Sequence, residues 1–126
     1  MRTQTKTLSI ELGDDDILRV EVLQNAEMTL DDAKESNAVC MELSGGRRLP
    51  RLCDYRGIRS QDRACRAYYA SEETAATCLV CAIVISSPVS RVIGNFYMGL
   101  NKPVTPTRLF TSESAAVEWL RTFSDH

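Results

Sequence analysis

Apolar and polar residues alternate over two segments near the start of the chain. Every second side chain is apolar within 7–12 and again within 17–23, as expected for strands with one buried face. The polar segment 13–16 that separates them is short enough for a tight turn. The pattern therefore predicts an antiparallel β-hairpin.

Helical periodicity follows in four later segments. The first predicted helix begins after Thr29, which caps an acidic first turn, and it ends at Gly45. The second is predicted to begin at Ser60, whose hydroxyl would cap it, and the closing helix to span 112–123.

The helix predicted after Ser87 carries the clearest signals. Pro88 suits the first helical position, and the sequence Asn-Lys-Pro at 101–103 would stop the helix. Apolar side chains recur at helical spacing: Val89, Val92, Ile93, Phe96, Tyr97 and Leu100. This stripe predicts a helix that packs into the core, with Gly94 allowing its backbone to approach the sheet closely.

Three further strands complete the expected fold. The apolar run 78–85 is predicted to be a central strand, and shorter strands are predicted at 49–55 and 107–110. After the hairpin each strand is followed by a helix, and right-handed crossovers then produce parallel pairing. The predicted fold class is a single α/β domain over 1–126. It has a mostly parallel five-stranded sheet, an N-terminal antiparallel hairpin and four helices.

Cysteine and histidine usage narrows the chemistry. The chain has five cysteines and no recognisable secretion signal, so we expect reduced thiols that pack as small apolar groups. Cys78 and Cys81 are three apart on a predicted strand, and we expect them on opposite faces, unable to form a redox pair or share a zinc ion. His126 is the last residue, a poor position for a general base. These features predict a non-enzymatic protein without metal or cofactor.

The longest apolar run, 78–85, is also shorter than the ~20 residues that a membrane span needs. We therefore expect a cytoplasmic protein with no membrane contact.

Positive charge is concentrated in one segment. Residues 47–66 contain seven arginines and two acids, whereas the whole chain has a formal charge of −2. The arginines bracket a predicted strand and the start of the second helix, and ligands of parallel α/β sheets usually bind at that end of the strands. Arginine forks suit phosphate or carboxylate. A solvated basic face beside the acidic first helix is the plainer interpretation. The acidic total and few aromatics disfavour nucleic acid.

The order of elements resembles that of the STAS domain, the SpoIIAA-like fold of bacterial anti-sigma-factor antagonists and sulphate-transporter tails. The segments 88–97 and 102–110, with Trp119 and Leu120, also look like a small uncharacterised bacterial group with that fold. The resemblance covers nearly the whole chain in topology.

The resemblance also implies where a regulatory site would lie. In the antagonists a strand ends in Asp, a Gly-containing loop follows, and an Asp-Ser pair opens the next helix and carries the phosphorylated serine. Asp54 and the loop at Arg56 are similar to the strand end, and Asp62 matches the family's Asp. Arg63 stands where the phosphorylated serine would be, and Ser60 lies two residues before Asp62. The switch is therefore expected to be absent or displaced.

The leading hypothesis is a regulatory STAS-like module that contacts a partner protein through residues 56–66. The candidate site residues are Asp54, Arg56, Arg59, Ser60, Asp62 and Arg63. A binder of a small anion or nucleotide, which would use Arg56, Arg59 and the amides around Ser60, remains an alternative. A homodimer and an enzyme based on Asp54 also stay open.

Overall fold

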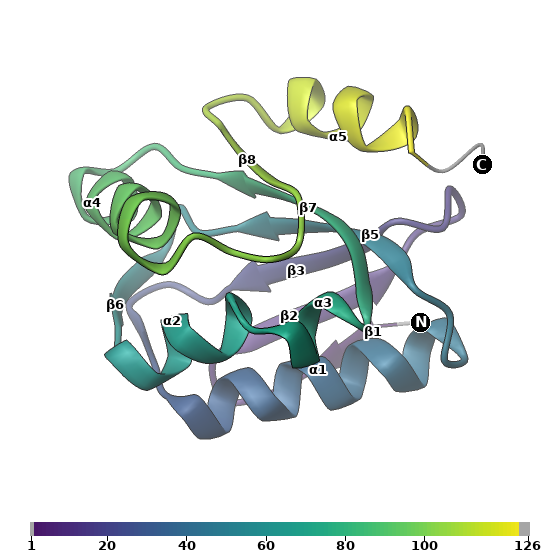
Figure 1. Ribbon diagram of the computed structural model, residues 1–126, viewed down its shortest axis with the longest axis horizontal. Coiled ribbons are helices and arrows are strands. Elements are labelled where there is room, and N and C mark those ends of the chain that lie inside the picture. The colour runs from purple at the N-terminus through teal and green to yellow at the C-terminus, as the bar shows by residue number, and fades with distance from the viewer. Residues whose placement is uncertain (1, 124–126) are drawn as a thin grey trace.

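A six-stranded mixed sheet forms the centre of the computed structural model, which describes residues 2–123 (Figure 1). The strands follow the order β1-β2-β3-β5-β7-β8 across the sheet. The first three pair antiparallel, and the pairs from β3 to β8 are parallel. The strands are β1 (Arg2–Gln4), β2 (Leu8–Leu12), β3 (Leu18–Val22), β5 (Leu49–Asp54), β7 (Cys78–Val84) and β8 (Thr107–Phe110). His126 lies outside the described residues.

Helices cover both faces of this sheet. They are α1 (Leu30–Ser44), α2 (Arg63–Tyr69), α3 (Glu72–Ala75), α4 (Pro88–Phe96) and α5 (Glu113–Arg121), and a π-helical turn, η1 (Tyr97–Asn101), continues α4. The connections from β3 to β5, from β5 to β7 and from β7 to β8 all step the same way across the sheet. Because such connections are right-handed, the helices within them lie on the same face. α5 lies on the opposite face, at the top of Figure 1. None of the helices in the described range is long and apolar enough to cross a membrane.

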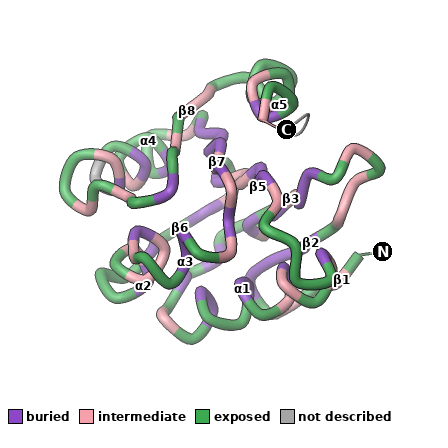
Figure 2. The backbone as a smooth tube through the Cα atoms, turned by 45° about the vertical axis from the view of Figure 1, so that its right-hand side comes forward, coloured by how far each residue is buried: buried purple, intermediate pink, exposed green. Residues whose placement is uncertain are grey.

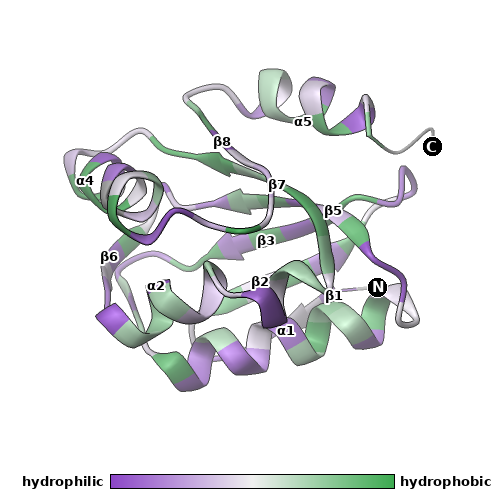
Figure 3. Ribbon diagram, in the orientation of Figure 1, coloured by the Kyte–Doolittle hydropathy of each residue, from purple (hydrophilic) through white to green (hydrophobic). Residues whose placement is uncertain are grey.

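The apolar core has two parts, one on each face of the sheet. The larger part joins residues of β2 and β3, such as Ile10 and Val20, to the face of α1 that carries Ala33 and Cys40. The smaller part packs Ala116 and Leu120 of α5 against β5 and β7. Buried segments follow the strands in Figure 2, and β7 is the most continuously hydrophobic strand in Figure 3.

Local sequence signals account for most element boundaries. Thr29 and Asp32 form a reciprocal capping box at the start of α1, and Gly45 ends that helix in the left-handed conformation at φ 67°. Ser87 caps α4 with Pro88 in its first turn, and Ser112 caps α5. The predicted hairpin and the predicted strands at 49–55, 78–85 and 107–110 are confirmed within one residue at each end.

The expected five strands and four helices were too few. β1 adds a sixth strand to the main sheet, and α3 is an additional short helix. Two further segments, β4 (Ala26–Met28) and β6 (Ile58–Gln61), form a separate parallel pair. These elements are only three or four residues long, so they carry little periodicity, and the partners of β4 and β6 are distant in the chain.

The expectation that Cys78 and Cys81 face opposite sides of the sheet was wrong. Both residues line the same internal cavity. The register between β5 and β7 shifts at this point, because Leu49 pairs with Cys78 whereas Arg51 pairs with Cys81. This irregularity gives β7 one extra residue relative to β5, which reverses the alternation between the two cysteines.

The apolar stripe of α4 and η1 is only partly in the core, contrary to the sequence-based expectation. Tyr97 is buried, whereas Val89, Val92 and Leu100 are 44%, 54% and 71% exposed. The side chain of Phe96 lies outside the described residues. Gly94 does permit close approach, since a Cβ there would lie 3.3 Å from Cγ2 of Ile85.

Leu120 anchors α5, and its side chain is fully buried. We expect Leu120→Ala to lower the free energy of unfolding by about 2–5 kcal/mol, as other large-to-small core substitutions do. Urea denaturation would measure the loss, with the exposed neighbour Glu118→Ala as control. Equal stability of the two variants would contradict the packing of α5 on the sheet.

Asp15 makes the folding stability of the protein vary with pH in the acid range. Hydrogen bonds from Arg19, at 2.9 and 3.0 Å, lower the pKa of Asp15 from its ordinary 3.8 to about 2. A lowered pKa means that the folded state favours the carboxylate, so this stabilisation is present above pH 3.8 and is lost as the pH falls towards 2.

For this partly exposed pair we expect Asp15→Asn to cost about 1 kcal/mol at neutral pH and nothing measurable in strong acid. Urea denaturation over this pH range would test the effect, with exposed Asp14→Asn as the matched control. A cost that persists unchanged in strong acid would rule out the ion pair as its source.

Candidate functional site

The six sequence-predicted site residues fall into two groups in the structure. Asp54 and Arg56 lie at the end of β5, next to the start of α5. Arg59 and Ser60 lie on β6, and Asp62 and Arg63 follow at the start of α2. The chain between 54 and 63 therefore does not form one continuous binding loop.

Asp54 and Arg56 bind each other. The Asp54 carboxylate accepts hydrogen bonds from Nε and Nη2 of Arg56, at 2.9 and 2.8 Å, and from the Arg56 backbone N–H at 3.0 Å. Nη2 of Arg56 also donates to Glu113 of α5 at 3.2 Å. Burial alone would raise the pKa of Asp54, but the hydrogen bonds and charge of Arg56 outweigh it and lower that pKa. Arg56 thus links β5 to α5, and its guanidinium is already paired.

Ser60 does not cap the second helix, which corrects the sequence-based prediction. The backbone stays extended through Ser60 because β6 pairs with β4, where Ser60 is opposite Glu27. The helix can begin only after this pairing ends. Asp62 is then the cap, and its carboxylate accepts the backbone N–H of Cys65 at 2.7 Å.

An open groove of about 500 Å³ lies between β6 and α4. Arg59, Ser60, Gln61 and Arg66 form its polar side, and Pro88, Val89, Val92 and Ile93 of α4 form its apolar side. In the orientation of Figure 1, β6 and α4 lie next to each other at the left of the molecule. These eight residues are called the groove.

The two sides of the groove have different chemistry. Val89 and Val92 are large apolar side chains that remain substantially exposed. On the other side, Nη1 of Arg66 donates to the Gln61 carbonyl at 2.6 Å, which fixes the arginine beside β6. Within residues 2–123, no acidic side chain forms an ion pair with Arg59 or Arg66.

The sequence prediction therefore identified only part of this groove. Arg59 and Ser60 line it, whereas Asp62 and Arg63 lie outside its lining and Asp54 and Arg56 belong to the other group. Arg66 belonged to the recognised arginine-rich segment, but the valines of α4 were expected in the core. The location of these valines beside β6 depends on tertiary packing. The one signal for it in the sequence was the excess of apolar positions along α4.

The described residues also contain no candidate metal site. No group of three or more His, Cys, Asp or Glu side chains in the described part of the chain is arranged to hold a metal ion.

Comparison with known proteins identifies the fold and a family. A family model described as "Domain of unknown function (DUF7793)" matches residues 10–124. An uncharacterised protein of the DUF3478 family from Shewanella loihica PV-4, which has a SpoIIAA-like fold, superposes with a TM-score of 0.59 at 14% identity. The match covers 94% of this chain and 98% of that one, so the fold is SpoIIAA-like, as the sequence resemblance indicated.

A second solved structure is closer in sequence. This protein with unknown function from Arthrobacter sp. FB24 shares 35% identity over 88% of this chain and 96% of its own, with a TM-score of 0.36. No curated protein matches the sequence.

The position of the helix cap gives a direct test of this part of the structure. We expect Asp62→Ala to destabilise the protein by about 1 kcal/mol, because it removes the acceptor for the Cys65 N–H. Ser60→Ala should change stability very little, since Ser60 is exposed on β6. Urea denaturation of both variants would distinguish the two caps, and a larger loss for Ser60→Ala would place the helix start at Ser60 instead.

Proposed function

This chain belongs to the DUF7793 domain family, and we propose that it is a non-enzymatic regulatory module whose groove binds an acidic, amphipathic segment of a partner protein. The observation that carries the proposal is the exposure of Val89 and Val92 on a helix whose Ile93 packs against the core. Exposed aliphatic side chains that gather in a concave surface are a common feature of protein interaction sites.

Charge complementarity specifies the kind of partner. Arg59 and Arg66 lie across the groove from the valines and give that side its positive charge. A partner helix or extended segment with leucine-like side chains on one edge and carboxylates on the other would satisfy both sides. Arginine pairs well with carboxylates, and charge of this kind contributes mainly to specificity and association rate.

The geometry gives less support to a small-anion or nucleotide site at the arginine-rich edge. Arg56 is paired with Asp54 and Glu113, so its guanidinium is engaged by carboxylates. The Asp62 carboxylate accepts from the first turn of α2, where it would repel a phosphate. A protein partner needs neither of these groups.

Ser60 supplies a means of regulation in the groove. It is exposed, and it lies in the groove lining with Arg59 and Arg66. A phosphate on Ser60 would neutralise this positive side and repel the carboxylates of the proposed partner. The displaced serine would thus weaken binding when it is modified, without any effect on a helix cap.

A fluorescent peptide with leucines on one helical edge and glutamates on the other would test the groove. We expect the wild-type protein to bind it and a lysine-for-glutamate version to bind much more weakly. Val92→Asp should reduce affinity at least about tenfold, the effect expected for a central interface residue. Val104→Asp is the matched control, because Val104 lies outside the groove and is 56% exposed, close to the 54% of Val92.

Charge changes provide a second comparison in the same assay. Arg59→Glu and Ser60→Asp should weaken peptide binding, whereas Arg47→Glu, which lies outside the groove, should not. Equal loss in Arg59→Glu and Arg47→Glu would show that only net charge matters and would contradict the proposal. Light scattering would detect the homodimer alternative: a wild-type dimer that Val92→Asp dissociates would assign the groove to a second copy of the chain.

A further inference from the structure

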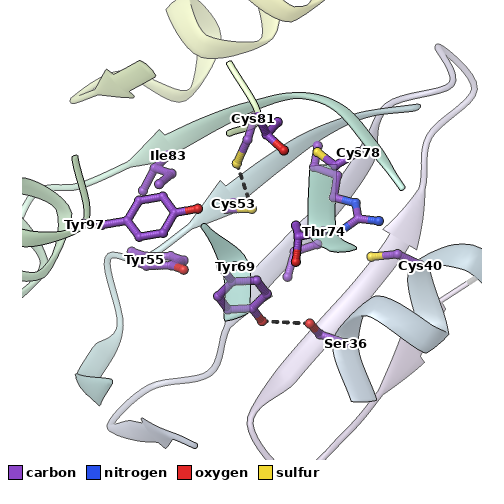
Figure 4. Close-up of a pocket in the computed structure, with 13 residues that line it drawn as sticks. Ser36, Cys40, Cys53, Tyr55, Tyr69, Thr74, Cys78, Cys81, Ile83 and Tyr97 are labelled. Atoms are coloured by element: carbon purple, nitrogen blue, oxygen red, sulfur yellow. Dashed lines mark hydrogen bonds between the residues drawn. The ribbon is translucent and has the colours of Figure 1, made fainter. Parts of the chain in front are cut away.

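A second, internal site lies between the main sheet and the helices on its larger core face. Here a cavity of about 40 Å³ is enclosed by β5, β7, α1 and α2, with Tyr97 of η1 beside it (Figure 4). It shares no lining residue with the groove. Cys53, Tyr69 and Cys81 in its lining are only partly buried.

Arg51 of β5 brings a positive charge into this cavity. The residue is only 4% exposed. Its Nη2 donates to the carbonyl and hydroxyl oxygens of Thr77, at 3.3 and 3.2 Å, and its buried Nε has no hydrogen-bond partner. No carboxylate among residues 2–123 forms an ion pair with Arg51. A buried guanidinium without a counter-charge is costly, so this arrangement calls for an anion.

Thr105 supplies another donor in the same lining. The residue is 2% exposed, and its hydroxyl has no hydrogen-bond partner. Four buried side-chain atoms in the described chain lack partners, and two of them, Nε of Arg51 and Oγ1 of Thr105, belong to residues of this one cavity. Buried polar groups are nearly always satisfied, so two unsatisfied donors in one lining indicate a missing acceptor.

The neighbouring thiols are poor counter-charges. Burial raises the pKa of Cys40 to about 11 and that of Cys78 to about 12, which leaves both neutral near pH 7. Cys53 and Cys81 form a thiol–thiol contact of 3.5 Å, drawn in Figure 4. This hydrogen bond lowers the pKa of Cys53 and raises that of Cys81, so Cys53 is the one thiol here that could ionise in place of a bound anion.

We propose that the cavity binds a small monocarboxylate through Nε of Arg51 and the hydroxyl of Thr105. The size follows from the volume, since about 40 Å³ of space for the centre of a water-sized sphere is roughly three times the ~10–15 Å³ that one water needs by the same measure. A ligand of a few heavy atoms such as formate or acetate is of this order, and butyrate is larger. The other hydroxyls of the lining, on Ser36 and Thr74, already bond to Tyr69 and to the Tyr68 carbonyl. The remaining lining is mostly thiol, tyrosine and aliphatic groups, which suits a short apolar end on the ligand.

Saturation-transfer NMR with formate and acetate, at constant ionic strength, would test this directly. We expect saturable binding of both acids and a matching rise in Tm, with no such effect from butyrate. Arg51→Met should weaken binding by about tenfold or more, and Thr105→Val by about threefold or more, as expected for lost hydrogen bonds to an anion. Arg47→Met is the matched control, because Arg47 belongs to the same arginine-rich segment but lies on the surface.

The possible results separate the alternatives. Saturable binding that is lost in Arg51→Met and retained in Arg47→Met would support the site. Absence of saturable binding, or equal binding of butyrate, would overturn it. Ultraviolet absorbance of a thiolate at neutral pH that disappears in Cys53→Ser would also overturn the proposal, because Arg51 would then have an internal counter-ion. If Arg51→Met does not fold, Thr105→Val and the acid-length series decide the question by the same criteria.

Discussion

The enclosed position of β5 is the constraint on which much of the structure depends. This strand pairs with β3 on one edge and β7 on the other, and helices cover both faces of the sheet around it. Leu52 faces the part of the core beneath α5, as expected for a strand buried on both sides. Arg51 faces the opposite cavity, so the fold holds a cation where an apolar side chain would ordinarily pack.

The pairing of β4 with β6 has a comparable effect on the outer surface. It keeps the chain extended as far as Gln61, which moves the start of α2 to Asp62 and leaves Ser60 exposed beside Arg59. The same short strand forms one side of the groove, and α4 forms the other. This short two-stranded pair thus determines both the helix boundary and the shape of the candidate interface.

α4 and η1 connect the two regions of interest. Val89 and Val92 project into the groove, whereas Tyr97, one to two turns later, is buried and lines the cavity. A single apolar stripe therefore serves two environments. The groove has one exposed apolar side and one cationic side, while the cavity is small and contains buried donors. Their chemistry differs enough that each requires its own ligand and its own test.

The sequence by itself determined the elements with strong local signals. Alternation identified β2 and β3, capping residues located α1, α4 and α5, and the order of elements identified the SpoIIAA-like fold. It also indicated the arginine-rich segment that supplies Arg59 and Ser60 to the groove. These features depend on neighbouring residues and on periodicity, which a single sequence contains.

Tertiary structure alone decided which of those residues act together. The β4–β6 pair joins segments about thirty residues apart, the shift in register between β5 and β7 turns Cys78 and Cys81 towards one cavity, and packing leaves Val92 exposed but buries Arg51. Each of these outcomes depends on contacts between elements that are distant in the chain. Periodicity shows that a side chain has a preferred face, but only the packed neighbours determine whether that face meets the core, a cavity or solvent.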